Sequence, residues 1–445
     1  MKQVKFFAID LFAGPGGLGE GFDRAGFNVV VSVDNDLWAC ETLKTRWLFR
    51  LLRKKGEVST YWSYARGEIT KEEIYHNNPE IKEQIEKRVI KETISEKTRE
   101  NLAIEILERI PSRNNNIVVL LGGPPCQLYS FIGRARYATM KDKYYRDPRR
   151  RLFEHYIFFL EKLKPDIFIF ENVPGIISAE LKRKNVFDIL VEEFNKVKYI
   201  PVKHPHDGIP QDYILNAADF GVPQLRKRVI IIGYRKGFER KFPDIRDLYY
   251  KLSSKNNQFL TVKDAIGDIP ELIPGEGNDR WFGYYKNNNS ISEYAKTLRN
   301  DSDGILNHKA RKHMESDRER YRFFIESHLN GNGRVNLKTL IKARPDLVPA
   351  HKNLHSFLDR FKVQWRDQPA STITAHIAKD GHYYIHPDVN QCRSFTVREA
   401  ARCQSFPDNY FFEGPRTEQF KQVGNAVPPL LAEYIAKAII STISG

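Results

Sequence analysis

A stiff turn that follows a short, wholly apolar run constrains the fold of this chain more than any other feature. Residues 117–121 are only Ile, Val and Leu, and the turn Gly-Gly-Pro-Pro-Cys-Gln at 122–127 comes directly after them. Such a run predicts a strand buried on both faces, as in a parallel sheet. The two prolines restrict the backbone, so Cys126 is held rigidly at the strand end. Open α/β sheets carry their chemistry at these ends, so Cys126 is a candidate nucleophile, although a lone free cysteine is more often a small buried hydrophobic residue.

Composition narrows the class of protein and of partner. A chain of 445 residues with 41% hydrophobic content can bury one large core and a smaller one. The 71 Lys and Arg residues outnumber the 56 Asp and Glu residues, and the net charge of +15 favours a polyanion, most commonly nucleic acid. Four scattered cysteines without a Cys-x-x-Cys pair disfavour disulfides and structural zinc, so we expect no bound metal. No leader or membrane-spanning stretch is evident, so we expect a cytoplasmic protein that does not bind membranes.

Strand and helix patterns alternate through the first half of the chain. Apolar runs predict strands at 4–9, 28–33, 117–121, 167–170 and 229–232. Apolar residues at helical spacing predict a helix over 152–163. This order predicts an α/β fold with a parallel sheet. We therefore place a first domain at 1–255, interrupted at about 71–113 by a charged segment that we interpret as a peripheral helical insertion.

The character of the sequence changes after residue 255. Polar, turn-rich stretches interrupt the segment 256–390, which lacks alternating strand and helix order, and here we predict a second, smaller domain. Residues 391–416 would form a hinge, and 417–445 would form a C-terminal helix that returns to the first domain. The apolar pattern over 430–440 suits packing of that helix against the sheet.

A glycine-rich turn follows the first predicted strand. Its sequence is Asp-Leu-Phe-Ala-Gly-Pro-Gly-Gly-Leu-Gly at 10–19, and the missing Cβ atoms would let a ligand approach the backbone. Asp34 ends the next predicted strand, where a carboxylate can accept hydrogen bonds from a ribose. The pair indicates a nucleotide or nucleoside ligand, and at this point a dinucleotide and S-adenosylmethionine fit equally well.

Three further motifs carry polar groups at the ends of predicted elements. Phe-Glu-Asn-Val at 170–173 puts Glu171 at the end of a buried strand, where burial would raise its pKa and suit a role in proton transfer. In Gln-Leu-Arg-Lys-Arg at 224–228, strand alternation points Arg226 and Arg228 to one side. Gln-Val-Gly-Asn-Ala-Val-Pro-Pro at 422–429 would open the C-terminal helix.

Together with the cysteine turn, these motifs in this order resemble the C5-cytosine-specific DNA methyltransferase family of restriction-modification systems. The resemblance covers roughly 4–235, apart from the insertion, and then 362–440. It implies a Rossmann-like, S-adenosylmethionine-dependent methyltransferase sheet. It also implies that the segment 256–390 is a smaller target-recognition domain.

The resemblance assigns an S-adenosylmethionine site to the glycine-rich turn and the strand ends around it. The turn matches the family's Phe-x-Gly-x-Gly block, and Asp34 matches its ribose-binding acid. Gly-Glu-Ile-Thr at 67–70 is similar to the block that contacts adenine, with Glu in place of the usual Asp. The cofactor-binding residues implied are Phe12, Gly14, Gly16, Gly17, Leu18, Asp34, Glu68 and Asn425.

The resemblance also implies the catalytic residues. The Cys126 thiolate would add to C6 of cytosine, Glu171 would act at N3 and Arg228 would hold O2. Arg226 would orient a phosphate or the loop around the nucleophile, and the basic segment 127–151 would close over a flipped base. Trp-Arg-Asp-Gln-Pro-Ala-Ser-Thr at 365–372 resembles the family's Arg-Pro-x-x-Thr block, with Gln at the usual Arg position. The DNA-binding residues implied are Gln127, Ser130, Asn172, Gln224 and Thr372.

We therefore expect a DNA (cytosine-5-)-methyltransferase that acts as a monomer on double-stranded DNA. The most natural role is the protective methylase of a type II restriction-modification system, paired in function with a cognate endonuclease. An RNA cytosine-5 methyltransferase of the same fold and an orphan or phage DNA methyltransferase stay open as alternatives. A nicotinamide oxidoreductase would leave the cysteine and arginine motifs unexplained, and an inert DNA-binding module would leave the catalytic set without a use.

Overall fold

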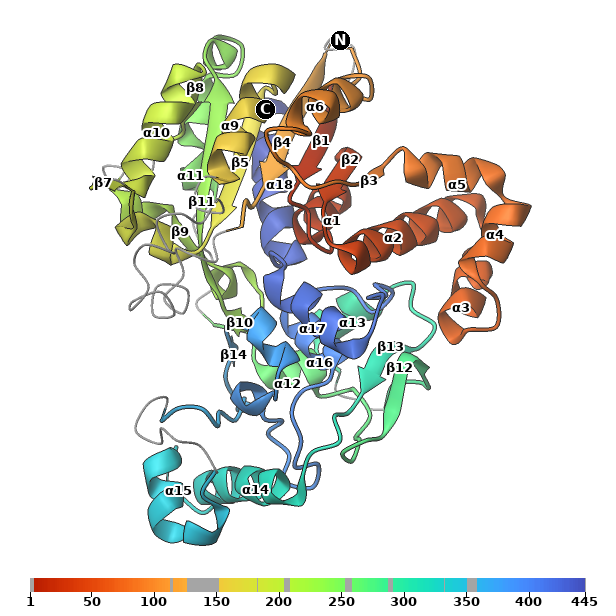
Figure 1. Cartoon of the computed structure of the whole chain (residues 1–445), viewed down its shortest axis with the longest axis vertical. Coiled ribbons are helices and arrows are strands. Elements are labelled where there is room, and N and C mark those ends of the chain that lie inside the picture. Colours follow the sequence, from red (N-terminus) through yellow and green to blue (C-terminus); the bar gives the residue numbers. More distant parts are fainter. Residues whose placement is uncertain are drawn as a thin grey trace.

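An open sheet of eight strands forms the centre of the part of the chain that the structure describes (Figure 1). The computed structural model describes residues 4–112, 115–125, 152–181, 183–203, 209–252, 258–286, 291–331, 333–349 and 358–444. In spatial order the strands are β3 (Val89–Lys91), β2 (Asn28–Asp34), β1 (Lys5–Leu11), β4 (Asn116–Gly122), β5 (Ile167–Asn172), β11 (Lys227–Arg235) and β8 (Tyr199–Pro201), with β9 (Ile214–Asn216) also paired to β11. Every apolar run that predicts a strand lies in this sheet, and the predicted α/β class is confirmed.

The ends of β1, β4 and β5 are aligned. Leu11 pairs with Gly122, and Gly122 pairs with Phe170, so these three parallel strands end in one row. The chain passes from β1 outward through β2 to β3 and resumes at β4 on the other side of β1. Open α/β sheets bind ligands outside the carboxyl ends of the strands at such a reversal of order. The register therefore brings the glycine-rich turn, the turn before Cys126 and Glu171 to one edge of the sheet.

One strand departs from the predicted parallel sheet. β11 runs antiparallel to β5, with Ile230 opposite Glu171, and also antiparallel to β8 and β9. Between β8 and β11 the described residues form short strands and 3-10 turns without an α-helix. A parallel neighbour needs a crossover connection, usually a helix, so a chain without one returns antiparallel. As a result, the start of β11 with Arg228 lies beside the end of β5.

Helices cover both faces of the sheet (Figure 1). The crossovers β1–α1–β2 and β4–α9–β5 run in opposite directions along the sheet, and right-handed crossovers then put their helices on opposite faces. α1 (Gly17–Arg24) packs with α18 (Pro429–Ser444), which also contacts α11 (Leu248–Lys251). α9 (Leu152–Leu163), with the bounds predicted, packs with α6 (Arg99–Leu107) and α10 (Val186–Lys196). These helices and the strands share one large hydrophobic core.

The charged segment 71–113 is built into this sheet. Its helices include α4 (Lys71–Asn77), α5 (Pro79–Glu86) and α6, and α5 packs on the long helix α2 (Leu37–Lys55), which is followed by α3 (Val58–Arg66). Between α5 and α6, β3 pairs in parallel with β2. The segment is therefore helical as predicted, but it also supplies an edge strand. A strand of three residues is too short to give a periodic signal in a charged sequence.

Most of the buried apolar residues between 255 and α18 form two smaller cores. One core contains apolar residues of α12 (Val262–Ile266), α13 (Glu293–Arg299), α16 (Val397–Cys403) and α17 (Arg416–Asn425). The other contains those of α14 (Glu315–Leu329) and α15 (Leu337–Ala343), which lie at the opposite end of the molecule from the two termini (Figure 1). Short strand pairs complete the structure: β6 (Glu180–Leu181) with β7 (Lys184–Asn185), β10 (Gln224–Leu225) with β14 (Ala370–Ser371), and β12 (Gly277–Phe282) with β13 (Ile305–Lys309).

The chain returns to the sheet through α17 and α18. The motif at 422–429 ends α17 at Asn425 and begins α18 at Pro429, so it joins two helices and does not simply open the last one. Proline suits the first turn of a helix because its missing N–H would have no partner there. The helical stretch Arg416–Ser444 is long and apolar enough to cross a membrane, but 72% of its apolar window is buried inside the protein, as in an ordinary core helix.

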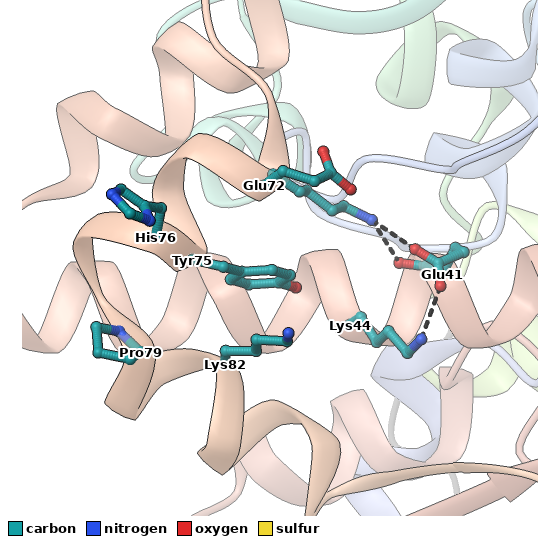
Figure 2. Close-up of a pocket in the computed structure, with 8 residues that line it drawn as sticks. Glu41, Lys44, Glu72, Tyr75, His76, Pro79 and Lys82 are labelled. Atoms are coloured by element: carbon teal, nitrogen blue, oxygen red, sulfur yellow. Dashed lines mark hydrogen bonds and ion pairs between the residues drawn. The ribbon is translucent and has the colours of Figure 1, made fainter.

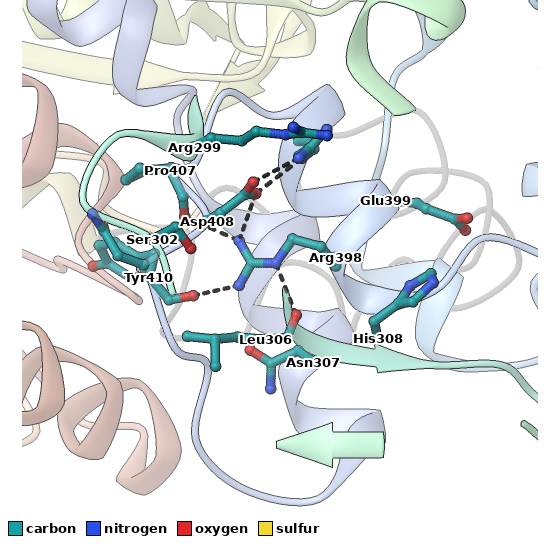
Figure 3. A network of polar contacts seen from close by, with 12 residues as sticks. Arg299, Ser302, Leu306, Asn307, His308, Arg398, Glu399, Pro407, Asp408 and Tyr410 are labelled. Atoms are coloured by element: carbon teal, nitrogen blue, oxygen red, sulfur yellow. Dashed lines mark hydrogen bonds and ion pairs between the residues drawn. The ribbon is translucent and has the colours of Figure 1, made fainter. Parts of the chain in front are cut away.

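Buried ion pairs hold the second half of the chain together. Arg402 on α16 pairs with Asp268 and with Asp408, each at 2.6 Å. Arg398, one turn earlier, donates to the carbonyl oxygens of Leu306 and Tyr410 (Figure 3). Both arginines and Asp408 are fully buried. Removing one partner of such a set leaves an uncompensated charge in the core, which costs far more than breaking a surface pair.

Replacing Arg402 with Met tests this network. We expect Arg402→Met to lower the free energy of unfolding by about 3–5 kcal/mol, because Asp268 and Asp408 lose a shared cation. Lys296→Met, which breaks the exposed pair with Glu293, is the control and should cost less than about 1 kcal/mol. Equilibrium urea unfolding measures both. Equal losses in the two variants would show that the buried network contributes no more than a surface pair.

Candidate active site

The glycine-rich turn between β1 and α1 is fixed to the end of β2. The amide of Ala13 donates to the carbonyl oxygen of Val33 at 3.0 Å, and the amide of Gly14 donates to Asp34 Oδ2 at 2.7 Å. Asp34 Oδ1 accepts from the amide of Asp36 at 2.9 Å. Each carboxylate oxygen has a further lone pair, so Asp34 can still accept a hydrogen bond from a ligand hydroxyl. The turn and the acid form one unit at the strand ends.

The glycines of the turn serve two purposes. Gly14 has a φ of +54°, and a Cβ placed there would meet no atom within 4 Å, so the space above its backbone is open. A Cβ at Gly16 would lie 2.6 Å from the Leu43 side chain, and one at Gly17 would lie 2.1 Å from the Val427 carbonyl oxygen. Gly14 therefore leaves room for a ligand at the backbone, whereas Gly16 and Gly17 allow neighbouring segments to pack closely.

Phe12 and Leu18 frame the turn. Phe12 is half-buried and has a φ of +54°, a left-handed conformation that is uncommon for a residue with a large side chain. Such strain is found where the surrounding structure holds a functional turn in place. The Leu18 side chain is buried in the core, so a ligand could contact only the backbone of this residue.

The C-terminal block reaches the same turn. The Val427 carbonyl lies against Gly17, and Gly424 packs on the backbone of Thr374 and Ala375. Asn425, between these contacts, is exposed at the end of α17. The fold therefore carries the Gly-Asn pair from the C-terminus to the neighbourhood of the glycine-rich turn, as the resemblance implies.

Glu68 has a different setting from the one predicted. Gly67 ends α3 with a φ of +81°, and Thr70 begins α4 with a capping box that it forms with Glu73. The Gly-Glu-Ile-Thr sequence is thus a connection between two helices, and it borders a cavity of about 500 Å³ beside Arg280. Among the described residues, no hydrogen bond or ion pair joins Glu68 to the glycine-rich turn or to Asp34; its charged neighbour is Arg66 at 4.0 Å.

The end of β3 is the strand end next to Asp34. Lys91 of β3 lies opposite Asp34 of β2 in the strand register, and the amide of Glu92 donates to the Asp34 carbonyl oxygen at 3.0 Å. Glu92 and Thr93 are exposed at this edge. They stand beside Asp34, the acid to which the resemblance assigns the ribose. The sequence gives no sign of their position, because the three residues of β3 are too few to show a strand pattern.

A buried acid lies beneath the turn. Asp10 is fully buried in β1; its Oδ2 accepts from the amide of Gly19 at 3.1 Å, and its Oδ1 has no hydrogen-bond partner among the described residues. Burial raises the pKa of Asp10 to about 7, the Gly19 bond opposes the rise, and the nearby charge of Asp34 adds to it. The turn therefore rests on a carboxyl group that titrates near neutral pH.

Glu171 and Arg228 form a mostly buried ion pair at the end of β5. Arg228 Nε lies 2.9 Å from Glu171 Oε1, and the side chains are 11% and 13% exposed, respectively. Burial raises the pKa of the Glu171 carboxyl, against the opposing charges of Arg228 and Arg226, so the predicted direction is confirmed. A Cβ on Gly123 would lie 2.7 Å from Glu171 Oε2. Gly123 therefore leaves room for the carboxyl beside the turn that leads to Cys126.

Asn172 supports that turn from within the protein. Its Nδ2 donates to the Pro124 carbonyl oxygen at 3.3 Å, and its Oδ1 accepts from the amide of Val173 at 3.0 Å. The side chain is buried. In this structure the Asn172 side chain holds the backbone before Cys126, and the contact with DNA that the resemblance implied stays a prediction. The predicted residues Cys126, Gln127 and Ser130 lie outside the described residues.

The segment 224–228 clamps two distant parts of the chain. Gln224 is fully buried, and its Oε1 accepts from the amide of Ile373 at 2.9 Å. Arg226 donates to the carbonyl oxygens of Ile373 and Gly424. These buried contacts hold backbone in place, which agrees with the loop-orienting role predicted for Arg226, while the contact of Gln224 with DNA stays a prediction.

The alternation predicted within this segment is confirmed. Arg226 and Arg228 are buried, whereas Lys227 between them is exposed. Thr372, the remaining predicted DNA-binding residue, is half-buried, and its hydroxyl donates to the Leu225 carbonyl oxygen at 2.6 Å. It therefore joins β10 to β14 at the margin of the site.

A cavity of about 560 Å³ lies apart from these strand ends, between α2, α4 and α5 (Figure 2). Acidic and basic side chains both line it, and two of its lysines already bond to an acid of the protein. Lys44 and Lys71 both bond to the carboxylate of Glu41, at 2.8 and 3.0 Å. We therefore restrict the candidate site to the edge formed by β1 to β5 and the start of β11.

Comparison with known proteins identifies relatives along almost the whole chain. The family model for C-5 cytosine-specific DNA methylase matches residues 6–75 and 68–441. Type II methyltransferase M.Bpa9945I of Bacillus paralicheniformis is 41% identical, with 98% of this chain and 99% of that protein covered. Type II methyltransferase M.DdeI of Desulfomicrobium norvegicum is 31% identical, with 97% and 88% covered.

Solved structures share the fold. A proposed DNA modification methyltransferase encoded within an E. coli prophage superposes with a TM-score of 0.61 at 22% identity, covering 99% of this chain and 100% of that one. The Entamoeba histolytica methyltransferase EhMeth gives a TM-score of 0.51 at 15% identity, with 99% of each chain covered. At these identities the likeness concerns the fold alone.

Asp10→Asn tests the titration of the buried acid. The folded-state pKa of about 7 lies above the ordinary 3.8, so the folded protein binds more protons than the unfolded chain between these values. Asp10 therefore contributes stability at low pH that is lost as the pH rises towards its folded pKa. We expect wild type to lose a few kcal/mol more than Asp10→Asn between about pH 5 and about pH 8. Urea unfolding across this range measures the difference, and parallel curves for the two proteins would contradict it.

Proposed function

The chain belongs to the C-5 cytosine-specific DNA methylase family, and from that premise we propose that it transfers a methyl group from S-adenosylmethionine to C5 of a cytosine within a specific short sequence of duplex DNA. The observation that carries the proposal is the register of β1, β4 and β5. It aligns a nucleoside-type turn, the turn before Cys126 and an acid with a raised pKa along one edge. A methyl donor, a nucleophile and a proton source have to meet at one cytosine, and this edge can bring them together.

The glycine-rich turn fits S-adenosylmethionine better than a dinucleotide. The amides of Ala13, Gly14 and Gly16 all donate within the protein, and Pro15 has no amide hydrogen, so this stretch offers no row of donors to a pyrophosphate. The open space above Gly14 suits a ligand that lies on the backbone without needing those donors. Asp34 would accept the ribose hydroxyls, and Glu92 and Thr93 would border the adenine. When bound, S-adenosylmethionine supplies a methyl group on an electrophilic sulfonium and brings no phosphate.

The Cys126 thiolate opens the reaction. Cytosine C5 is a weak nucleophile, so the sulfur first adds to C6 and the electrons of the C5–C6 double bond move toward C5 and N3. C5 then takes the methyl group. The methyl–sulfur bond of the donor breaks in this transfer. Loss of the C5 proton to a base then re-forms the double bond and expels Cys126 as a thiolate, and return of the N3 proton to Glu171 restores the enzyme. Asn172 and Gly123 support this step by fixing and making room for the turn that carries the cysteine.

Glu171 and Arg228 act on the other side of the ring. Negative charge that develops on the ring during thiolate addition is neutralised when Glu171 holds a proton at N3. The raised pKa supports that role, because a larger fraction of the carboxyl groups then carries the proton near neutral pH and can act as a general acid. Arg228, 2.9 Å from Glu171, would donate from its guanidinium to the cytosine O2 while it holds the carboxyl in place.

The target cytosine would reach this edge by leaving the duplex. Its C5 and C6 atoms are stacked inside double-stranded DNA, and extrusion of one base costs a few kcal/mol. The segment 127–151 contains a run of basic residues at 146–151, which suits contact with phosphates around the extruded base. The net charge of +15 supports attraction of the whole protein to DNA.

The segment 256–390 would be the target-recognition domain, followed by a hinge at 391–416 and the return of 417–445. Its support is the small core around α14 and α15, which lies within this segment at the end of the molecule (Figure 1), and a second core outside the sheet that the segment shares with α16 and α17. The clamp of Gln224 and Arg226 on Ile373 would hold this domain at a set distance from the catalytic edge. Base readout by side chains of such a domain then selects the sequence.

The relatives that are named type II methyltransferases support a role in restriction-modification. The chain would act in the cytoplasm as a monomer and protect DNA from a cognate endonuclease. RNA cytosine-5 methylation is the second candidate, because it uses the same fold and nucleophile. The long segment after residue 255 favours DNA, since reading a sequence in duplex DNA requires a large surface in the grooves.

Transfer of labelled methyl from S-adenosylmethionine tests the reaction and the nucleophile together. We expect wild type to label C5 of cytosine in one short duplex sequence, mapped at single-nucleotide resolution. Cys126→Ala should lower the rate by at least about 10³-fold, because the covalent route is lost. Cys392→Ala, which removes a buried thiol outside the site, should transfer at close to the wild-type rate. Labelling of transfer RNA in place of DNA would favour the second candidate, and undiminished transfer by Cys126→Ala would contradict the mechanism.

Glu171→Gln tests the proton at N3. The amide can still form a hydrogen bond but cannot give a proton, so we expect the single-turnover rate to fall by about 10²–10⁴-fold. In wild type the rate should decline as the pH rises through the raised pKa of Glu171, and this decline should be absent from the variant. Rates in the two proteins that follow the same pH profile would assign the titration to another group.

A further inference from the structure

Tyr410 reaches the cofactor turn from the far end of the chain. It lies in the segment after α16, and its buried ring packs beside Phe406 and Phe412, with ring centroids 4.9 and 5.4 Å away. Its hydroxyl donates to the carbonyl oxygen of Pro15 in the glycine-rich turn. A residue from the segment predicted to be a hinge therefore holds the middle of the turn between β1 and α1.

The contact lies on the side of the turn that packs against the rest of the protein. A Cβ placed on Gly16 would lie 3.0 Å from the Tyr410 hydroxyl and 2.6 Å from the Leu43 side chain, so this side is closely packed. A Cβ placed on Gly14 would meet nothing within 4 Å. The turn is thus supported on one side and open on the other, and the hydroxyl of Tyr410 stands on the supporting side.

Tyr410 is itself held rigidly. Its carbonyl oxygen accepts from Arg398, whose guanidinium also donates to the carbonyl oxygens of Leu306 and Pro407 (Figure 3). The guanidinium of Arg46 lies 5.0 Å from the centre of the Tyr410 ring and pairs with Glu20 on α1. A residue whose backbone is bonded to the buried Arg398 and whose ring lies against the mostly buried Arg46 can fix the carbonyl that it contacts.

We propose that Tyr410 is a positioning residue for the methyl donor: its hydroxyl holds the Pro15 carbonyl so that the backbone at Gly14 keeps the shape that S-adenosylmethionine binds. The inference rests on the proposed function, because it takes this turn to be the cofactor site. Without the hydroxyl, the buried Pro15 carbonyl loses its donor, and the turn has to shift or leave that group unpaired. Ligand binding then has to supply part of the free energy that orders the turn, so the affinity for S-adenosylmethionine falls.

The chain offers a matched control in Tyr61. This residue is also fully buried, and its hydroxyl donates to the Asn409 carbonyl oxygen at 2.7 Å, one residue before Tyr410. Tyr61→Phe therefore removes the same chemical group from the same kind of bond in the same region, without touching the glycine-rich turn. A general loosening of the segment 405–412 would affect both variants, whereas a specific role at Pro15 would affect Tyr410→Phe alone.

The first measurement is calorimetric binding of S-adenosylhomocysteine, the product of methyl transfer, to the complete protein. We expect Tyr410→Phe to weaken binding by about 3–10-fold, as for the loss of one buried hydrogen bond, and Tyr61→Phe to stay within about twofold of wild type. In methyl transfer, Tyr410→Phe should raise KM for the donor and leave kcat near wild type. Thermal unfolding of both variants shows whether their losses of stability match.

A second measurement needs no ligand. Hydrogen exchange of the Gly16 amide, which donates to Ala13 at 2.9 Å within the turn, should be faster in Tyr410→Phe than in wild type and unchanged in Tyr61→Phe. Tyr410→Phe with wild-type affinity and exchange would overturn the inference and leave the proposed function intact. Equal loss of affinity in both variants, in proportion to their loss of stability, would also overturn it. A wild type that binds no S-adenosylhomocysteine would instead overturn the proposed cofactor.

Discussion

The hydrogen-bonded register of β1, β4 and β5 is the constraint on which the rest of the site depends. Leu11, Gly122 and Phe170 lie in one row, so the three segments that follow them begin at one edge. Alternate residues of a strand face opposite sides, and a slip of one residue would send Glu171 to the other face of the sheet. The antiparallel return of β11 completes the edge, because it brings Arg228 within 2.9 Å of Glu171. Two charged groups 57 residues apart thus meet through strand pairing alone.

Polar side chains hold irregular backbone in place around this edge. Asn172 bonds to the carbonyl of Pro124, Arg226 to that of Gly424 and Tyr410 to that of Pro15. Turns and chain crossings bury carbonyl groups that have no partner in a helix or sheet, and an unpaired buried carbonyl is costly. Side chains that donate to them therefore stabilise the turns on which ligands are bound. Two of these three contacts involve residues beyond 370, namely Gly424 and Tyr410, so the returning segments are held to the glycine-rich turn and to the start of β11.

The sequence predicted the strands of the sheet well and the connections less well. Apolar runs located β1, β2, β4, β5 and β11, and helical spacing located α9, because burial on both faces or on one face leaves a local pattern. β3 was missed, since three residues carry no period. Gly67 and Thr70 matched a family block by letter, but in the structure they end one helix and begin the next. Gln224 and Asn172 read as ligand-binding residues because a sequence does not show whether an amide side chain faces a ligand or a buried carbonyl.

By itself, the sequence determined the fold class and the positions of the strand ends, and it singled out the candidate reactive groups at those ends. Those properties are local: the length of an apolar run, a proline that fixes φ, a glycine that lacks Cβ. Only the tertiary structure decided the direction of β11, the pairing of Glu171 with Arg228, the burial that raises the Glu171 pKa and the support of Pro15 by Tyr410. Each of these joins residues far apart in the chain, and such a contact depends on how the packed elements meet rather than on any pattern within one of them.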